Sequence, residues 1–374
     1  MYGADLIEAL RQRDASISFF GAGGERMRAA GCDIVVDARD LAVVGITEIF
    51  SHLPKILGLY KRLLRAADER RPALAVVIDS PAFNWRVARQ MRKRGIPVVY
   101  YVCPQFWAWR QGRVKLLRKY VNKALVIFPF EEKFYRDRGV DAAFVGHPLA
   151  DLKPPAIPRE AYAAEYSLDV SKPWITLMPG SRRKEVRMNL PEMLAAVALL
   201  GNSYEYLLPV ARTLEPKFIR ESIQQRSAGQ VPNIRLVPES LPALHHARAG
   251  IVASGTATVE AALMQLPFVM VYRVSPLTYA LGKPRIKVAH YAMVNLIAGE
   301  EVVPELVQGK FTAENVAAEL RKIIPEGEAR TRMLQGLAGV KAKLRRGANG
   351  ARPADLAADT ILNLLRGAGT QARS

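Results

Sequence analysis

Cysteine is scarce in this sequence, which leaves little basis for a fold held together by cross-links. The chain has 374 residues but only two cysteines, Cys32 and Cys103, and neither belongs to a Cys-x-x-Cys pair. This usage argues against a disulfide framework and a zinc site, and it fits a reducing cytosol. We therefore expect no metal.

Long apolar runs and acidic residues are also in short supply. No stretch of about 18 uncharged apolar residues occurs, so no helix is expected to span a bilayer, and no secretory signal opens the chain. Asp and Glu total 35 against 54 Lys and Arg, which gives a net charge of +19. Such a balance favours an anionic partner: nucleic acid, an acidic membrane surface or phosphorylated substrates. The alternative is a solubilising charge without a partner.

Short apolar runs recur along the chain, with room for a helix between them. They cover residues 17–20, 73–78, 97–102, 124–128, 143–145, 174–178, 204–210, 234–237, 250–253 and 268–272. Continuous apolar runs of this length suit strands that are buried on both faces. Strands that alternate with helices predict parallel, doubly wound sheets, so the fold class is α/β.

A proline-rich segment divides the pattern into two domains. Three prolines fall within residues 152–158, which reads as a linker. We expect an N-terminal Rossmann-like domain over 1–158, a C-terminal one over 159–345, and a last helix over 353–366 that packs back on the first. The chain opens on a helical pattern, so the first strand of the N-terminal domain and its loop are expected to be absent. Ligands of such sheets bind beyond the carboxyl ends of the strands, here in a cleft between the domains.

Two turns in the second half suit a nucleotide diphosphate. Ser254-Gly255-Thr256-Ala257 joins a strand to a helix, whose free N–H groups and positive dipole end attract phosphate. Glu260, one turn further, can accept two ribose hydroxyls, or it is only a dipole partner of a capped helix. In the second turn, Gly180-Ser181-Arg182, an arginine fork can neutralise a leaving diphosphate. The alternative is a solvated basic turn.

Polar residues at strand ends in the first half suit an acceptor. Asp79 closes an apolar run, and in a cleft it can take the proton of an attacking sugar hydroxyl. Otherwise it forms an Asx-type turn. Trp107, Trp109 and Arg110 form an aromatic and basic wall for a sugar or lipid, or part of the core. His147 stands near the domain boundary, either in the cleft or as a structural histidine.

Residues 41–64 combine an apolar face with basic flanks. Val43, Val44, Ile46 and Ile49 belong to that face, and Lys55 and Lys61 are among the interleaved cations. The pattern is typical of a helix lying in a membrane interface. An ordinary amphipathic helix that packs on a core gives the same pattern.

Eight sequence pieces together resemble the lipid-A-disaccharide synthase family, glycosyltransferases of the GT-B type. In chain order they are GAGGERM (21–27), LAVVGITE (41–48), IDSPAFN (78–84), PQFWAWR (104–110), GHPL (146–149), LMPGSR (177–182), SGTA (254–257) and VNLIAG (294–299). They span nearly the whole chain. The WAWR run and the PGSR turn are the most specific of them.

The resemblance implies a reaction and assigns residues to it. UDP-2,3-diacylglucosamine would donate its sugar, with inversion, to the 6-hydroxyl of 2,3-diacylglucosamine 1-phosphate (lipid X). The products would be a β-1,6 disaccharide and UDP, formed without cofactor or metal at the anionic cytoplasmic face of the inner membrane. Asp79 and Arg182 would be catalytic. UDP would contact Gly180, Ser181, Ser254, Gly255, Thr256, Ala257, Glu260 and Asn295. Acceptor, lipid or membrane would contact Val43, Val44, Ile46, Ile49, Trp107, Trp109 and Arg110.

Other functions remain open on the residues alone. A different GT-B enzyme, such as the transferase that acts on undecaprenyl-pyrophosphoryl-muramyl peptide, or a UDP-sugar epimerase, would share the UDP turns. The epimerase would not need the basic and apolar segment 41–64. A non-enzymatic binder of anionic surfaces would use only the charge, and no nucleic-acid motif supports a nucleic-acid partner. The sequence carries no signal for an oligomeric state.

Overall fold

A computed structural model describes residues 2–42, 49–225, 232–283, 288–345 and 351–371. The chain forms two compact units. Unit 1 comprises residues 1–148 and 345–374, and unit 2 comprises residues 149–344.

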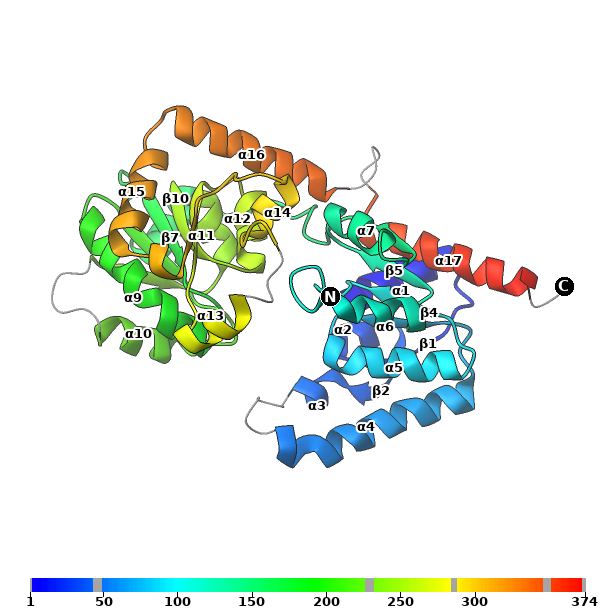
Figure 1. The fold of residues 1–374 in the computed structure, drawn as a ribbon. Coiled ribbons are helices and arrows are strands. Elements are labelled where there is room, and N and C mark those ends of the chain that lie inside the picture. The colour runs from blue at the N-terminus through cyan, green and yellow to red at the C-terminus, as the bar shows by residue number, and fades with distance from the viewer. Residues whose placement is uncertain (1, 43–48, 226–231, 284–287, 346–350, 372–374) are drawn as a thin grey trace. The chain divides into compact units, whose positions relative to one another are not determined.

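Unit 2 contains a continuous parallel sheet of six strands (Figure 1). Its strands are β7 (Trp174–Met178), β8 (Glu205–Pro209), β9 (Ile234–Val237), β10 (Ala249–Ala253), β11 (Phe268–Tyr272) and β12 (Glu305–Val307). The spatial order is β12-β11-β10-β7-β8-β9, the order of a Rossmann sheet. The direction of winding reverses between β7 and β10, which pair directly, Ile251 opposite Leu177 and Val252 opposite Met178. This reversal is the position at which such sheets bind ligands.

Helices connect and cover the strands of unit 2. They are α8 (Arg159–Tyr166), α9 (Arg183–Leu200), α10 (Pro216–Gln224), α11 (Ser240–His246), α12 (Thr256–Leu263), α13 (Pro276–Gly282), α14 (Met293–Ala298), α15 (Ala313–Ile323) and α16 (Glu328–Leu344), with a 3-10 turn η3 (Gln308–Lys310). Proline at the first position of α10 and α13 fixes the backbone where its missing N–H is not needed. Trp174, Ile175 and Phe268 are fully buried, so the sheet is covered on both faces.

Unit 1 contains two parallel sheets. The first pairs β1 (Phe19–Gly23) with β2 (Cys32–Asp37). The second has the order β3 (Ala75–Ile78), β4 (Val98–Tyr101), β5 (Lys123–Val126), β6 (Ala142–Phe144). All four residues of β4 are buried, whereas only Val77 is buried in β3. Among the described residues β3 pairs on one side only, which accounts for its exposure.

The helices of unit 1 include the first and the last described helix of the chain. They are α1 (Tyr2–Arg13), α2 (Glu25–Ala29), α3 (Ala38–Ala42), α4 (Ile49–Arg70), α5 (Pro81–Lys93), α6 (Val114–Tyr120), α7 (Pro129–Arg136) and α17 (Pro353–Gln371), with a 3-10 turn η1 (Gln111–Arg113). The last helix packs beside the first (Figure 1). Arg13 on α1 forms ion pairs with Asp355 at 3.1 Å and Asp359 at 2.5 Å on α17.

The elements expected from the sequence are largely confirmed. Every predicted strand is present, with ends that differ by a few residues, and all the sheets are parallel. Two strands were not predicted, β2 and β12. Val43, Val44 and Ile46 lie outside the described residues. Ile49 begins α4, but the description does not extend to its side chain.

Candidate functional site

In unit 2, the turn after β7 is closed by a carboxylate from the helix that follows it. Glu185, in the first turn of α9, accepts hydrogen bonds through Oε2 from the backbone N–H groups of Ser181 (2.9 Å) and Arg182 (3.2 Å). Its Oε1 accepts from the Arg182 guanidinium at 3.0 Å. The Arg182 side chain is 81% exposed. An exposed pair three residues apart on a helix is worth a few tenths of a kcal/mol, so Arg182 is free to exchange this partner for a ligand.

Gly180 is required by the geometry of this turn. Its φ is +121°, and a Cβ at this position would lie 2.6 Å from Cβ of Glu185. Two more side chains hold the turn: Asn189 donates to the Pro179 carbonyl at 2.9 Å, and Thr213 donates to the Ser181 carbonyl at 2.6 Å. Sequence reasoning missed Glu185, Asn189 and Thr213. Glu185 had a visible signal, since a carboxylate three residues after a helix start is typical of a capping residue.

The turn after β10 lies beside the turn after β7, because the two strands are neighbours. Gly255 has φ +141°, and both Gly255 and Thr256 are exposed. Ser254 is half-buried, and its hydroxyl donates to the Tyr291 carbonyl at 3.0 Å. Thr258 is buried, and its hydroxyl donates back to the Gly255 carbonyl at 2.7 Å. The exposed backbone of the turn, with Ala257 half-buried behind it, is therefore the part open to a ligand.

Glu260 on α12 is half-buried. Burial raises the pKa of its carboxyl, and a hydrogen bond from Ser240 partly offsets that rise. The Ser240 hydroxyl on α11 donates to Oε2 of Glu260 at 3.1 Å. This contact fixes one oxygen of the carboxyl group and was not anticipated from the sequence.

Asn295 on α14 is fully buried, and each of its polar atoms is engaged within unit 2. Its Nδ2 donates to the Val303 carbonyl (2.9 Å) and to Glu305 Oε1 (2.8 Å). Its Oδ1 accepts from the backbone N–H groups of Val302 (2.9 Å) and Val303 (3.0 Å). Glu305 in turn accepts from the N–H groups of Tyr291 and Ala292 at the start of α14. An amide with four bonds has no capacity left for a ligand, so Asn295 shapes the loop against which Ser254 rests.

In unit 1, Asp79 follows β3 in a strained turn and is exposed. Asp79 and Ser80 have φ of +48° and +46°. The Asp79 carbonyl accepts from Tyr100 Oη at 2.8 Å and from Asn84 Nδ2 at 2.7 Å, so the backbone of the turn is fixed from both sides. Among the described residues no side chain forms a hydrogen bond or ion pair with the Asp79 carboxylate.

The segment after β4 carries the aromatic wall. Trp107 is buried and donates its indole N–H to Glu131 Oε1 at 2.8 Å. Trp109 is 46% exposed, and the Arg110 guanidinium lies 4.1 Å from the centre of its ring. Glu131 itself is 1% exposed, and burial raises its pKa from 4.5 to about 7 in spite of its hydrogen bonds. Sequence reasoning missed this residue.

His147 is buried against Phe128, with ring centres 5.1 Å apart. Burial lowers its pKa from 6.5 to about 4. The imidazole is therefore neutral at physiological pH. Within unit 1 this is the environment of a packing residue.

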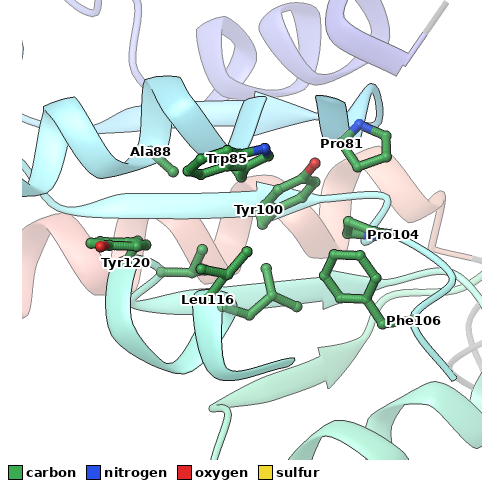
Figure 2. Close-up of a pocket in the computed structure, with 10 residues that line it drawn as sticks. Pro81, Trp85, Ala88, Tyr100, Pro104, Phe106, Leu116 and Tyr120 are labelled. Atoms are coloured by element: carbon green, nitrogen blue, oxygen red, sulfur yellow. The ribbon is translucent and has the colours of Figure 1, made fainter. Parts of the chain in front are cut away.

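Two hollows mark the outer helices of unit 1. One is a narrow apolar pocket between α5, β4 and α6, and Trp85, Tyr100 and Tyr120 are among the residues that line it (Figure 2). Its cavity is about 10 Å³, close to the least space that one water needs, so it holds no ligand in this conformation. The other is an open groove of about 440 Å³ beside Lys115, Arg118 and Arg138. Neither hollow includes Asp79.

Two further surveys cover the described part of the chain only. No three His, Cys, Asp or Glu side chains gather there in a way that could hold a metal ion. No described helix combines the length and the apolar character that crossing a membrane requires.

The sequence and the fold were compared with known proteins. The family model described as lipid-A-disaccharide synthetase matches residues 1–354. A lipid-A-disaccharide synthase of Koribacter versatilis is 51% identical over 365 residues, which cover 97% of this chain and 95% of the relative.

Two solved structures share the fold at low sequence identity. The calicheamicin glycosyltransferase CalG4 has a TM-score of 0.57 at 17% identity and covers 97% of this chain and 94% of its own. A putative UDP-N-acetylglucosamine 2-epimerase from Listeria monocytogenes has a TM-score of 0.60 at 13% identity, with 98% and 93% covered. These likenesses confirm an α/β fold of the GT-B type with two Rossmann-like units.

Proposed function

This chain belongs to the lipid-A-disaccharide synthetase family and is a glycosyltransferase, and we propose that it makes the lipid A disaccharide. It transfers 2,3-diacylglucosamine from UDP-2,3-diacylglucosamine to the 6-hydroxyl of 2,3-diacylglucosamine 1-phosphate, with release of UDP. The family match over residues 1–354 is the observation that carries this proposal. The pair of turns at the reversal of the unit 2 sheet supports it, because phosphate-bearing ligands bind at such positions.

The chemistry needs a base for the acceptor and a positive site for the leaving group. Asp79 takes the proton of the 6-hydroxyl as the oxygen attacks the anomeric carbon of the donor. The bond from that carbon to the UDP oxygen breaks on the opposite side, which inverts the configuration. The electron pair leaves with the diphosphate, and Arg182 stabilises the charge that develops there. Arg182 suits this role because, among the described residues, its guanidinium pairs only with Glu185, and that pair is exposed.

We assign the donor to unit 2. The diphosphate binds the exposed turn Ser254, Gly255, Thr256 and Ala257, where the N-terminus of α12 supplies N–H groups, and the turn at Gly180 and Ser181, where it replaces Glu185 as the acceptor of the N–H groups that precede α9. Glu260 accepts the ribose hydroxyls with the oxygen that Ser240 leaves available. Asn295 contributes through the loop that it holds rather than by direct contact.

We assign the acceptor to unit 1. Asp79, Trp107, Trp109 and Arg110 follow the neighbouring strands β3 and β4. His147 serves as packing. The acyl chains of both substrates require access to a bilayer, and a net charge of +19 favours an anionic one. We therefore propose that the enzyme works at the cytoplasmic face of the inner membrane, with Val43, Val44, Ile46 and Ile49 toward the lipid.

Release of UDP tests the proposal. The enzyme is incubated with UDP-2,3-diacylglucosamine alone and with added 2,3-diacylglucosamine 1-phosphate in mixed micelles. We expect UDP and disaccharide in equal amounts, and only when the acceptor is present. Conversion of the donor sugar without acceptor would point to an epimerase instead. Binding of anionic vesicles without UDP release under any condition would point to a surface binder.

A further inference from the structure

Backbone strain in unit 1 is concentrated beside Asp79. Eight described non-glycine residues have positive φ; Asp79 (+48°), Ser80 (+46°) and Val102 (+57°) lie directly after β3 and β4, and Arg110 (+58°) ends the segment that follows β4. Such conformations cost on the order of 1–3 kcal/mol each, and they collect at functional sites where the surroundings hold them. Val102 is the most unusual, because a branched Cβ is crowded in this region. The segment 102–110, called the aromatic loop below, therefore has a strained residue at each end.

The buried side chain of Glu131 forms hydrogen bonds that fix the position of the aromatic loop. Glu131 on α7 binds the indole N–H of Trp107 through Oε1 at 2.8 Å. Its Oε2 accepts from the backbone N–H groups of Ile127 (3.2 Å) and Phe128 (3.1 Å), where β5 ends. Glu131 thereby ties the loop after one strand to the end of the next strand.

Three more contacts fix the loop along its length. Tyr135 donates its hydroxyl to the Pro104 carbonyl. Gln111 donates to the Trp107 carbonyl at 3.0 Å, and the Cys103 thiol lies 3.4 Å from the Tyr100 carbonyl. Because Phe106 and Trp107 are buried, the underside of the loop belongs to the core. The strain is thus sustained by packing and hydrogen bonds.

Trp109 and Arg110, called the tip of the aromatic loop, are exposed and carry a positive charge. Trp109 is 46% exposed, with the Arg110 guanidinium 4.1 Å from its ring centre. Arg110 forms no ion pair with any residue that the structure describes. Residues 80–130 contain eleven Lys and Arg and no Asp or Glu. A guanidinium stacked on an indole, in a segment of the chain that has no acidic residue, is suited to a phosphate, which it binds through two parallel N–H groups.

The tip and Asp79 leave neighbouring strands at the same edge of the sheet. Ile78 pairs with Tyr101, the Asp79 N–H donates to the Tyr101 carbonyl at 3.1 Å, and Tyr100 donates to the Asp79 carbonyl at 2.8 Å. The base and the loop that carries the tip thus start from adjacent strands of one sheet in unit 1.

We propose that Arg110 binds the phosphate of the sugar acceptor, and that Glu131 is the positioning residue that holds the aromatic loop for it. Trp109 provides the apolar surface next to the sugar ring. This inference rests on the proposed function. It adds a recognition site for the phosphomonoester, on the same unit as the base.

The test combines a change in the protein with a change in the ligand. The kcat/KM for 2,3-diacylglucosamine 1-phosphate is compared with that for the same acceptor without its phosphate, in detergent micelles free of other phosphates. We expect the wild type to prefer the phosphorylated acceptor by about 10- to 100-fold, the range of a charge-assisted hydrogen bond. Arg110→Ala should lower kcat/KM by this factor for the phosphorylated acceptor only. Arg110→Lys should keep part of the preference. Arg113→Ala, an exposed arginine of η1, is the matched control and should retain the preference.

Two results would overturn the inference. One is an equal loss with both acceptors in Arg110→Ala, which would assign Arg110 to the micelle surface or to folding. The other is a wild type that does not distinguish the acceptors. Binding is followed in parallel through tryptophan fluorescence without donor. If no acceptor supports UDP release, the proposed reaction fails, while phosphate-dependent binding that Arg110→Ala abolishes would still support the recognition site.

Glu131 is tested by a readout that general destabilisation would not move. The variant Glu131→Gln keeps one acceptor oxygen in place of two, and the NH₂ group of the new amide cannot accept from the Trp107 indole. We expect the preference for the phosphorylated acceptor to fall several-fold, while the KM for the UDP-sugar stays unchanged. An unchanged preference would contradict the positioning role. A parallel rise in both KM values would show a structural role only.

Discussion

Both units turn the chain sharply where their strands end, but they use different residues to do so. In unit 2 the turns after β7 and β10 have their positive φ at glycines, Gly180 (+121°) and Gly255 (+141°). In unit 1 the positive φ angles after β3 and β4 belong to Asp79, Val102 and Arg110, which carry side chains. Glycine adopts this conformation freely, whereas the other residues do so at a cost.

Under the proposed function, the difference follows from what each unit presents to its ligand. A diphosphate is bound by backbone N–H groups, and a glycine without Cβ lets the ligand approach them. A proton acceptor and a guanidinium that binds phosphate are both side chains. The residue with positive φ is therefore the functional residue itself or its neighbour. The predictions below test this division, a backbone site in unit 2 and a side-chain site in unit 1, in order of decreasing effect.

The largest effect is expected at Asp79. Asn also tolerates positive φ, so Asp79→Asn should keep the turn while removing the base. We expect kcat to fall by about 10²–10⁴-fold, the usual contribution of a general base. The affinity for UDP, measured by calorimetry, should stay within twofold of the wild type because unit 2 is untouched. A variant that lost UDP affinity in proportion to turnover would break the division between the units.

The next largest effect is expected at Asn295. Asn295→Ala leaves two N–H groups, a carbonyl and a carboxylate oxygen without their partner. At about 1 kcal/mol for each lost hydrogen bond, the free energy of unfolding should fall by about 3–4 kcal/mol. UDP affinity should change little at a temperature where the variant is folded. Asn202→Ala, an exposed asparagine of the same unit, should leave stability unchanged. A hundredfold loss of UDP affinity in folded Asn295→Ala would show a direct contact.

Gly180 tests why unit 2 uses glycine. In Gly180→Ala the new Cβ meets Cβ of Glu185 at 2.6 Å and also adopts an unfavourable φ. We expect about 2 kcal/mol of lost stability and at least tenfold weaker UDP binding, because the turn and Glu185 must move. Gly201→Ala separates the two causes, since Gly201 has φ +78° but open space around it. It should cost about 1–3 kcal/mol and leave UDP binding intact. Equal UDP affinity in both variants would contradict the backbone site.

The sequence predicted unit 2 better than unit 1, and the reason lies in the residue types. Glycine and serine after an apolar run are direct signals of a turn, so the turns at Gly180 and Ser254 could be predicted from local pattern. In unit 1 nothing local distinguishes Val102 or Arg110 as strained residues. Their conformation depends on hydrogen bonds from α7, more than twenty residues away.

The missed elements have the same origin. β2 (Cys32–Asp37) contains two aspartates, and its apolar and polar residues alternate only weakly. β12 has three residues. Neither strand therefore gives an apolar run in the sequence. Glu131 reads as an ordinary first-turn carboxylate of α7, and only the fold brings the indole of Trp107 to it. Asn295 was matched to the UDP site through the family resemblance, which does not reveal that its four bonds are internal.

The smallest effect is a pH dependence of stability close to zero, expected in the wild type. Two buried groups of unit 1 titrate there with opposite effects on the free energy of unfolding. Burial raises the pKa of Glu131 to about 7, so the folded state holds a proton that the unfolded state releases above its pKa of about 4.5. Its contribution to stability is full below pH 4.5 and is lost as pH rises to 7. Burial lowers the pKa of His147 to about 4, so the unfolded state binds a proton first, and stability is lost as pH falls from 6.5 to 4.

Between pH 4.5 and 6.5 these two slopes have opposite signs and similar size, so their sum is close to zero. Removing one group reveals the titration of the other. As pH rises from 4.5 to 6.5, Glu131→Gln should gain about 2–3 kcal/mol of stability relative to the wild type. His147→Gln should lose about the same amount over this range. Urea unfolding at half-unit steps of pH measures both, and subtracting the wild-type curve removes the other titrating groups. Parallel curves for all three proteins would mean that burial shifts the pKa of neither group.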